Sequence, residues 1–191
     1  MIDLARILRT VITTLEQSKI GYVVVGSTAA AAWGVARATR DVDIVVMVDA
    51  DQLDTVLTAL LAADLYVPLD QAHEAADSGG SFNVLDPDHG GKIDLFVTGS
   101  DDAFTASRLD RRIRADVFDV PCWVASAEDV VLAKLRWRLT SRSEVQWRDC
   151  IEIASTNELD IPYMRHWAHE LGVVADLTEL LDNATDATDP D

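Results

Sequence analysis

Two short apolar segments of this chain carry carboxylates at positions where a buried strand is expected. Asp41-Val42-Asp43 leads directly into an apolar run that ends at Val48, and Asp94 lies inside the run Lys92-Ile93-Asp94-Leu95-Phe96-Val97. Residues two apart in a strand share one face, so Asp41 and Asp43 repel each other unless a cation lies between them. A carboxylate inside a short buried strand is costly unless it is paired or bound to a metal. Any fold of this chain therefore has to supply positive charge at these positions.

The three acids have the chemistry of a divalent-metal site. Asp41, Asp43 and Asp94 offer oxygen ligands, which suit cations that keep coordination positions open for phosphate. Two metal ions about 3.5–4 Å apart can activate a hydroxyl nucleophile and stabilise a leaving pyrophosphate. The structural alternative for Asp41 and Asp43 is a charged strand entrance with Asp41 capping a turn, and the alternative for Asp94 is a salt bridge to Lys92 or an arginine. We therefore treat the three acids as candidate catalytic and metal-binding residues.

A phosphate-binding turn is predicted upstream of these acids. The β-branched run 22–25 predicts a buried strand, and the alanine-rich segment 28–33 predicts a helix. Between them, a glycine lets the backbone approach a ligand closely, a serine hydroxyl can donate to a terminal phosphate, and the helix start favours anions. Two arginines follow, which either meet the remaining charge of a triphosphate or form surface pairs with Asp residues. A Gly-Ser pair alone is also typical of an ordinary turn. The candidate nucleotide-binding residues of this segment are Gly26, Ser27, Arg37 and Arg40.

With these residues in this order, the chain resembles the nucleotidyltransferases of the DNA polymerase β superfamily. The pattern is Gly26-Ser27, a helix, Asp41-x-Asp43 and then Asp94. The string Arg37-Ala38-Thr39-Arg40-Asp41-Val42-Asp43-Ile44 is similar to the minimal bacterial members, including the AbiEii-like abortive-infection toxins. Ser126-Ala127-Glu128-Asp129, Lys134-Leu135 and Arg148-Asp149 resemble the helical half of those proteins, so the resemblance covers most of residues 20 to 170.

The resemblance implies a reaction and a set of residue roles. Asp41 and Asp43 would bind metal, Asp94 would bind metal or act as a base, and Lys134 would face the nucleotide. An acceptor hydroxyl would attack the α-phosphate of an NTP, with two Mg²⁺ ions, or Mn²⁺, held by the three acids. By the same resemblance the acceptor is a tRNA or a protein side chain, as in a toxin-like enzyme whose partner would be a cognate antitoxin.

The net charge constrains the acceptor and the partners. The chain carries 33 acidic and 16 basic residues, for a formal charge of −17, which argues against non-specific binding to DNA. Residues 108–148 are locally basic, with nine basic and six acidic residues, so an RNA acceptor would dock at one place. An acidic surface attracts a polycationic small molecule, which makes an aminoglycoside acceptor the second hypothesis. The third is a non-catalytic nucleotide-binding or toxin–antitoxin module.

Hydrophobic periodicity predicts an α/β (α+β) fold, in which a mixed sheet with flanking helices precedes a small all-helical part. The predicted strands are 22–25, 43–48, 82–85, 93–97 and 120–124, and the predicted helices are 4–15, 28–33, 51–63, 126–139, 144–154, 161–171 and 177–181. The corresponding domains are 1–125 (nucleotidyltransferase), 126–184 (helical subdomain) and 185–191 (a disordered acidic tail). Predicted core residues on the helices and the last strand include Trp137, Trp147, Trp167, Cys122 and Cys150.

The sequence also predicts where the protein resides. Its first residues lack the basic head and apolar core of a signal peptide, and the longest uncharged run, 20–36, falls short of a membrane span. Two cysteines fit a reducing compartment and are too few for a disulfide framework. We expect a cytoplasmic protein with no membrane partner, and the abundance of Ala, Asp and Arg indicates a GC-rich bacterial genome.

Overall fold

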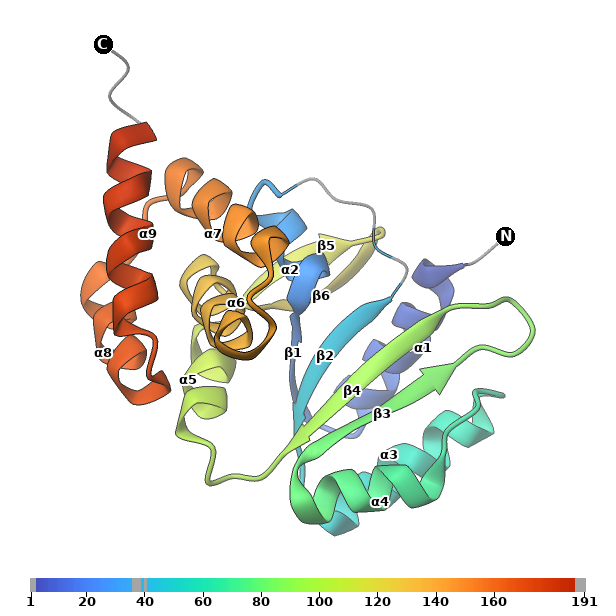
Figure 1. The fold of residues 1–191 in the computed structure, drawn as a ribbon. Coiled ribbons are helices and arrows are strands. Elements are labelled where there is room, and N and C mark those ends of the chain that lie inside the picture. Colours follow the sequence, from blue (N-terminus) through green and yellow to red (C-terminus); the bar gives the residue numbers. More distant parts are fainter. Residues whose placement is uncertain (1–2, 36–38, 40, 188–191) are drawn as a thin grey trace. The chain divides into compact units, whose positions relative to one another are not determined.

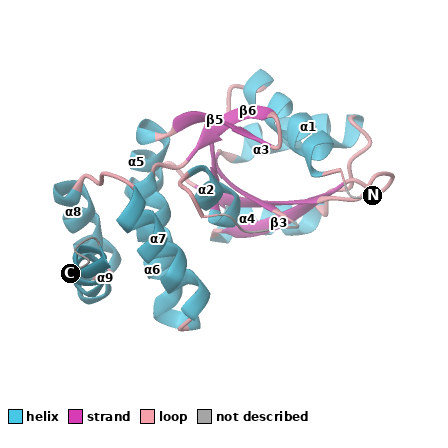
Figure 2. Ribbon diagram, turned by 90° about the horizontal axis from the view of Figure 1, so that it is seen from above, coloured by secondary structure: helices cyan, strands magenta, loops and turns pink. Residues whose placement is uncertain are grey.

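A six-stranded mixed sheet organises the first part of the chain in the computed structural model, which describes residues 3–35, 39 and 41–187. The strand order is β3-β4-β2-β1-β6-β5 (Figure 1). β2 pairs with β4 in parallel, as β1 does with β6, and the other neighbours are antiparallel. Seen from above, the strands form a curved band (Figure 2). The strands are β1 (Gly21–Val25), β2 (Val42–Met47), β3 (Gly80–Leu85), β4 (Lys92–Thr98), β5 (Ile113–Val117) and β6 (Val120–Val124).

Nine helices occur among the described residues, and six of them start at a side-chain cap. In each of the six, an Asp or Ser accepts a hydrogen bond from the backbone amide three residues on, which satisfies one of the free amides of the first turn. These capping residues are Asp3, Asp49, Asp102, Ser126, Ser143 and Asp160. The helices are α1 (Leu4–Gln17), α2 (Gly26–Ala32), α3 (Ala50–Ala62), α4 (Leu69–Ser78), α5 (Ala103–Arg111), α6 (Ala127–Ser141), α7 (Glu144–Thr156), α8 (Ile161–Leu171) and α9 (Val174–Ala187).

The described residues pack as two units. Unit 1 contains the described parts of 1–28 and 38–125, and unit 2 contains those of 29–37 and 126–191. The second half of α2 therefore packs with the C-terminal helices, and within unit 2 Asn157 Nδ2 donates to the carbonyl oxygen of Trp33 at 3.1 Å. The division into domains at residues 125 and 126 stays a prediction, because packing units need not fold independently.

In unit 1 the sheet has one closed apolar face. Ile93, Leu95 and Val97 in β4 are at most 5% exposed, and the alternate residues of β2, from Val42 to Val46, are equally buried. Side chains alternate between the two faces of a strand, so Lys92, Asp94 and Phe96 lie on the opposite face of β4. All three are less buried than the apolar residues between them. The hydrophobic pattern of β4 thus decides which face receives its charged side chains.

Unit 2 is held together by buried polar contacts as well as by its apolar core. Lys134 in α6 is 4% exposed, and its ammonium donates to Asp149 Oδ2 in α7 at 2.7 Å and to Gln146 Oε1 at 2.8 Å. Because Gln146 accepts from Lys134, the capping box predicted at the start of α7 is only half formed. The cap itself is present, since the Gln146 amide donates to Ser143 Oγ.

The structure confirms the predicted fold class and adds three elements that were not predicted: α4, α5 and β5. Helix α4 buries only two alanines, Ala72 and Ala75, so it has no apolar periodicity to detect. Strand β5 lies at the sheet edge and pairs with β6 alone, so four of its five residues are at least partly exposed. Helix α5 is short and buries a charged residue, Arg108, beside Phe104.

The prediction that Trp137 belongs to the core is wrong, because its side chain is 62% exposed. Its neighbour Arg138 turns inward instead, with its guanidinium 4.5 Å from the centre of the Trp147 ring and 2.5 Å from Asp176 Oδ1. Trp147 is buried as predicted, and so are Cys122 and Cys150, both of which are free thiols.

The last helix extends further than the periodicity indicates. Helix α9 ends at Ala187, so the first three residues of the predicted tail are helical, and 188–191 lie outside the described residues. Within the part of the chain that the structure describes, no helix is long and apolar enough to span the bilayer.

The ion pair between Lys134 and Asp149 provides a stability test. Asp149→Asn leaves a buried ammonium without its counter-charge, which should lower the free energy of unfolding by about 3 kcal/mol in urea titrations. Asp54→Asn is the control, because the Asp54 side chain is 66% exposed and pairs with His73 at the surface. Loss of this exposed pair should lower the free energy of unfolding by less than about 1 kcal/mol. An equal loss for the two variants would contradict a structural role of the buried pair.

Candidate active site

A row of polar side chains crosses three neighbouring strands of unit 1 at one level. Asp43 in β2 is paired with Asp94 in β4, and Asp94 is paired with Asn83 in β3. Paired residues on adjacent strands place their side chains on the same face of the sheet. On the other side Asp43 pairs with Val25, the last residue of β1, which is followed directly by Gly26. The strand register therefore brings two of the predicted acids together from distant parts of the sequence.

Asp41 precedes β2 and is fixed through its backbone. Thr28 Oγ1 lies 3.4 Å from the carbonyl oxygen of Asp41, and Thr39 Oγ1 donates to the same oxygen at 2.9 Å. Thr39 Oγ1 also lies 3.1 Å from Asp41 Oδ1. The Asp41 side chain is nevertheless 44% exposed, so its carboxylate is accessible while its backbone is held.

Gly26 is required by the position of Asp43. Its φ of +67° lies in the left-handed region, which glycine adopts without steric cost. A Cβ on Gly26 would stand 2.1 Å from Asp43 Oδ2 and 3.0 Å from its carboxyl carbon. The Asp43 carboxylate thus lies directly against Gly26 at the start of α2, and the predicted approach of a ligand to Gly26 stays a prediction.

Lys92 links two of the three acids. Its ammonium donates to Asp94 Oδ2 at 2.6 Å and lies 3.4 Å from Asp41 Oδ2. The hydrogen bond to Asp94 is the main reason that the pKa of Lys92 lies above its ordinary value; partial burial works against it, and Asp41 adds to it. The structural alternative considered for Asp94, a salt bridge to Lys92, is therefore present, and it occurs within the same cluster as the two other acids.

The donor set fits a divalent cation. Three carboxylates with only oxygen donors are the ligands that Mg²⁺ and Mn²⁺ favour, and the Lys92 ammonium shows that a cation is accommodated between Asp41 and Asp94. Among the described residues, no three His, Cys, Asp or Glu side chains already surround one point suited to a metal ion. Asp43 and Asp94 thus share one face of the sheet, and the Lys92 ammonium contacts Asp94 and Asp41.

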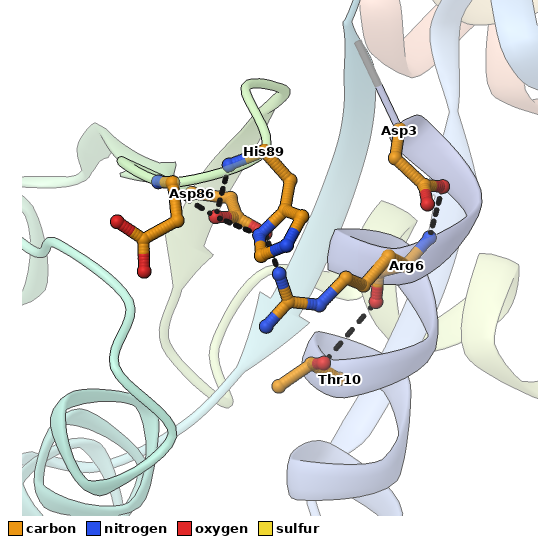
Figure 3. A network of polar contacts seen from close by, with 6 residues as sticks. Asp3, Arg6, Thr10, Asp86 and His89 are labelled. Carbon is orange, nitrogen blue, oxygen red and sulfur yellow. Dashed lines mark hydrogen bonds and ion pairs between the residues drawn. The ribbon is translucent and has the colours of Figure 1, made fainter. Parts of the chain in front are cut away.

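The hairpin that carries Asp94 is anchored to α1 (Figure 3). Asp86, at 5% exposure, accepts hydrogen bonds from the backbone amides of Asp88 and His89, and its Oδ2 lies 3.2 Å from an Arg6 guanidinium nitrogen. His89 Nδ1 lies 3.3 Å from the other carboxylate oxygen. These contacts fix the β3–β4 loop, so the start of β4 has a defined position.

The other predicted site residues have different surroundings. Ser27, half-buried, is the second residue of α2 and is adjacent to Gly26. Lys134 belongs to unit 2, where it forms the buried pair with Asp149, and its nucleotide contact stays a prediction. Arg37 and Arg40 lie outside the described residues.

Sequence reasoning did not assign Asn83, Thr28 or Thr39 to the site, and it considered Lys92 only as the pairing partner of Asp94. Asn83 could have been found from its place between the buried Phe82 and Val84, which puts it on the open face of β3. The two threonines act through the backbone of Asp41, and no local pattern in the sequence reveals such a contact.

Solved structures with this fold include nucleotidyltransferases. The antigenic nucleotidyltransferase-like protein from Paracoccidioides brasiliensis is 20% identical, with a TM-score of 0.57 over 94% of this chain and 92% of that chain. The antibiotic-resistance factor ANT(2'')-Ia is 13% identical, with a TM-score of 0.57 over 96% and 95% of the two chains. The lincosamide antibiotic adenylyltransferase LnuA is 14% identical, with a TM-score of 0.52 over 82% of this chain and 99% of that chain. At identities this low, the likeness establishes a shared fold.

The fold and a family match both indicate a nucleotidyltransferase-like protein. The sequence matches the family described as "Nucleotidyltransferase of unknown function (DUF6036)" over residues 1–183, and the chain belongs to this family. None of the curated proteins matches the sequence significantly. The prediction of a nucleotidyltransferase family is thus confirmed, while the resemblance to the DNA polymerase β superfamily and to its AbiEii-like toxins stays a prediction.

The contact between Gly26 and Asp43 yields a second prediction. Gly26→Ala should destabilise unit 1 by more than the roughly 1–2 kcal/mol that a left-handed alanine costs, because the new methyl group also displaces the Asp43 carboxylate. Gly172→Ala is the matched control, since Gly172 is left-handed, with a φ of +71° and a ψ of 26°, and nothing lies within 4 Å of an added Cβ. Most of the excess loss should disappear when Gly26→Ala is made in an Asp43→Ala background, where only the Cβ of residue 43, at 3.2 Å, still meets the added methyl group; urea unfolding measures this as a double-mutant cycle. Equal losses for the two glycine variants would contradict the contact.

Proposed function

We propose that this protein is a metal-dependent nucleotidyltransferase that moves an NMP from an NTP to an acceptor hydroxyl. The observation that carries the proposal is the pairing of Asp43 with Asp94 beside Gly26, with Asp41 joined to Asp94 through Lys92. An apolar sheet has no structural need for three carboxylates at one position, whereas transfer of a highly charged phosphate group requires cations held there. Membership in a nucleotidyltransferase family supports the class of reaction.

In the proposed reaction each of the three acids has a role. Asp41, Asp43 and Asp94 would hold divalent cations, Mg²⁺ or Mn²⁺, which when bound offset the charge of the triphosphate and of the leaving pyrophosphate. Alternatively, Asp94, whose side chain is 16% exposed, would accept the proton of the acceptor hydroxyl instead of binding metal. The acceptor oxygen then bonds to the α-phosphorus, the bond from that phosphorus to the bridging oxygen breaks, and pyrophosphate leaves.

Residues around the row would position the donor. Gly26 keeps the Asp43 carboxylate against the turn that begins α2, so a triphosphate bound at this turn would lie beside the acids. Ser27 would donate its hydroxyl to a phosphate oxygen, and Arg37, Arg40 and Lys134 remain proposed nucleotide contacts. Catalysis would arise mainly from positioning and from charge neutralisation.

The acceptor is the less constrained part of the proposal. A tRNA or protein acceptor, with a cognate antitoxin, rests on the resemblance to toxin-like members of the superfamily. A small cationic acceptor is favoured by the net charge of −17 and by the fold shared with ANT(2'')-Ia, which has been captured with adenylyl-2''-tobramycin. The fold shared with the lincosamide enzyme LnuA likewise supports a small-molecule acceptor.

Label transfer tests the reaction itself. Incubation with each α-³²P-labelled NTP, Mn²⁺ or Mg²⁺, and pools of tRNA, proteins and aminoglycosides should label one acceptor class. Asp43→Asn and Asp94→Asn should each reduce transfer on the order of 10²-fold or more, because they remove a charge that the reacting phosphates require. Asp51→Asn, an exposed acid in the first turn of α3, should leave transfer unchanged. Undiminished transfer by both site variants would overturn the proposal.

The same reaction identifies the acceptor class. If the acceptor is a small cationic molecule, the label should appear in a low-mass product that survives nuclease and protease treatment. Binding of that acceptor should also weaken less steeply with salt than binding of tRNA would, because a tRNA contact releases many counterions. Label found only in nuclease-sensitive material would contradict a small-molecule acceptor and support tRNA.

A further inference from the structure

Lys92 holds a central position among the acids. It begins β4 two residues before Asp94, and its ammonium contacts Asp94 at 2.6 Å and Asp41 at 3.4 Å. The chain has only three lysines, against 13 arginines, so an ammonium at this point is not a consequence of composition. The lysine ammonium is a compact, strongly hydrated charge on a flexible side chain, so it can fit between two carboxylates and can also leave them. A guanidinium, which binds a carboxylate through two hydrogen bonds, leaves less readily.

The exposure of these groups favours a reversible contact. The Lys92 side chain is 38% exposed, and those of Asp41 and Asp94 are 44% and 16% exposed. Ion pairs open to water to this extent are weak and exchange readily. A divalent cation has twice the charge of an ammonium and attracts the same carboxylates more strongly. The Lys92 contact is therefore of a kind that a bound divalent cation would break.

The backbone of Lys92 would stay in place while its side chain moves. Lys92 is paired with Leu85 across the β3–β4 hairpin, and the loop of that hairpin is fixed by Asp86 and its contact with Arg6. Asp41 is likewise held through its carbonyl oxygen by Thr28 and Thr39. Rotation of one side chain is thus enough to exchange the ammonium for another cation.

We propose that Lys92 is the resident counter-ion of Asp41 and Asp94, and that a divalent cation binds by displacing its ammonium. This inference rests on the proposed function, because it takes the three acids as metal ligands. Lys92 keeps the carboxylates on one face when no metal is bound, and it sets how strongly metal binds by competing for them. It is a positioning residue with an effect on metal affinity, and no proton transfer is assigned to it.

Lysine acylation of the unmodified protein tests the displacement directly. An ammonium held by two carboxylates reacts slowly with an amine-acylating reagent, and one released into water reacts faster. Lys19 is exposed and Lys134 is 4% exposed, so the chain supplies one lysine that should react throughout and one that should stay protected. Addition of Mg²⁺ or Mn²⁺ at constant ionic strength should raise the acylation rate of Lys92 about tenfold, as resolved by peptide mass spectrometry, without changing the other two.

Metal affinity provides the second readout, independent of activity. Lys92→Met should bind Mn²⁺ about tenfold more tightly than the parent, as measured by electron paramagnetic resonance of the free ion, because the competing charge is gone. Lys92→Arg retains the charge, and because a bidentate guanidinium leaves the carboxylates less readily, it should bind Mn²⁺ no more tightly than the parent does. Asp43→Asn should bind Mn²⁺ more weakly than the parent, and it should abolish the response of Lys92 to metal.

The outcomes separate the inference from the proposed function. If Asp43→Asn weakens Mn²⁺ binding but the Lys92 acylation rate does not respond to metal and Lys92→Met binds no more tightly, the displacement is wrong and the metal site stands. If Asp43→Asn binds Mn²⁺ as well as the parent, the metal site at these acids is wrong, and the inference falls with it. Absence of Mn²⁺ binding by both the parent and Lys92→Met also overturns the displacement.

Discussion

The site depends on one constraint, the parallel in-register pairing of β2 with β4 that aligns Asp43 with Asp94. Adjacent strands lie about 4.7–4.9 Å apart, so this register places two carboxylates as neighbours on one face. A slip of one residue would turn one acid to the opposite face and break the row. That slip is prevented by the buried side of the same strands, where Ile93, Leu95 and Val97 are packed. The apolar core therefore fixes the functional face indirectly, through strand alternation.

Two local features accommodate the charge that this register creates. Gly26 adopts a left-handed conformation and leaves room for the Asp43 carboxylate, at a position where any other residue would collide with it. Lys92 supplies an ammonium to Asp41 and Asp94. A strand or turn with only a structural role needs neither a left-handed glycine against a carboxylate nor a lysine between two acids. Features that break the local rules in this way concentrate at functional sites. The proposed nucleotidyl transfer explains why both occur at the same level of the sheet.

The sequence predicts the strands that carry the acids of the candidate site better than it predicts the periphery of the fold. Asp43 and Asp94 could be identified because a carboxylate in a short apolar strand violates the hydrophobic pattern, and that violation is visible without a structure. Edge strand β5 and helix α4 carry no such signal, since little of either is buried. Trp137 has the helical spacing of a core residue, but none of the other described elements covers it near the end of α6, so its side chain is exposed. Which part of a helix is covered depends on tertiary packing, and the helical spacing does not reveal it. The contacts of Thr28 and Thr39 with the Asp41 backbone likewise exist only after the chain has folded.

We propose that the acids on β2 and β4 bind the metal that serves nucleotidyl transfer. A crystal structure of the protein soaked with Mn²⁺ and an NTP analogue that cannot be cleaved at the α-phosphate, with anomalous scattering to locate the metal, tests this proposal. An anomalous peak is expected within bonding distance of the Asp43 and Asp94 carboxylates, with the triphosphate beside Gly26. A peak bound elsewhere, or a nucleotide bound away from these strands, would contradict it.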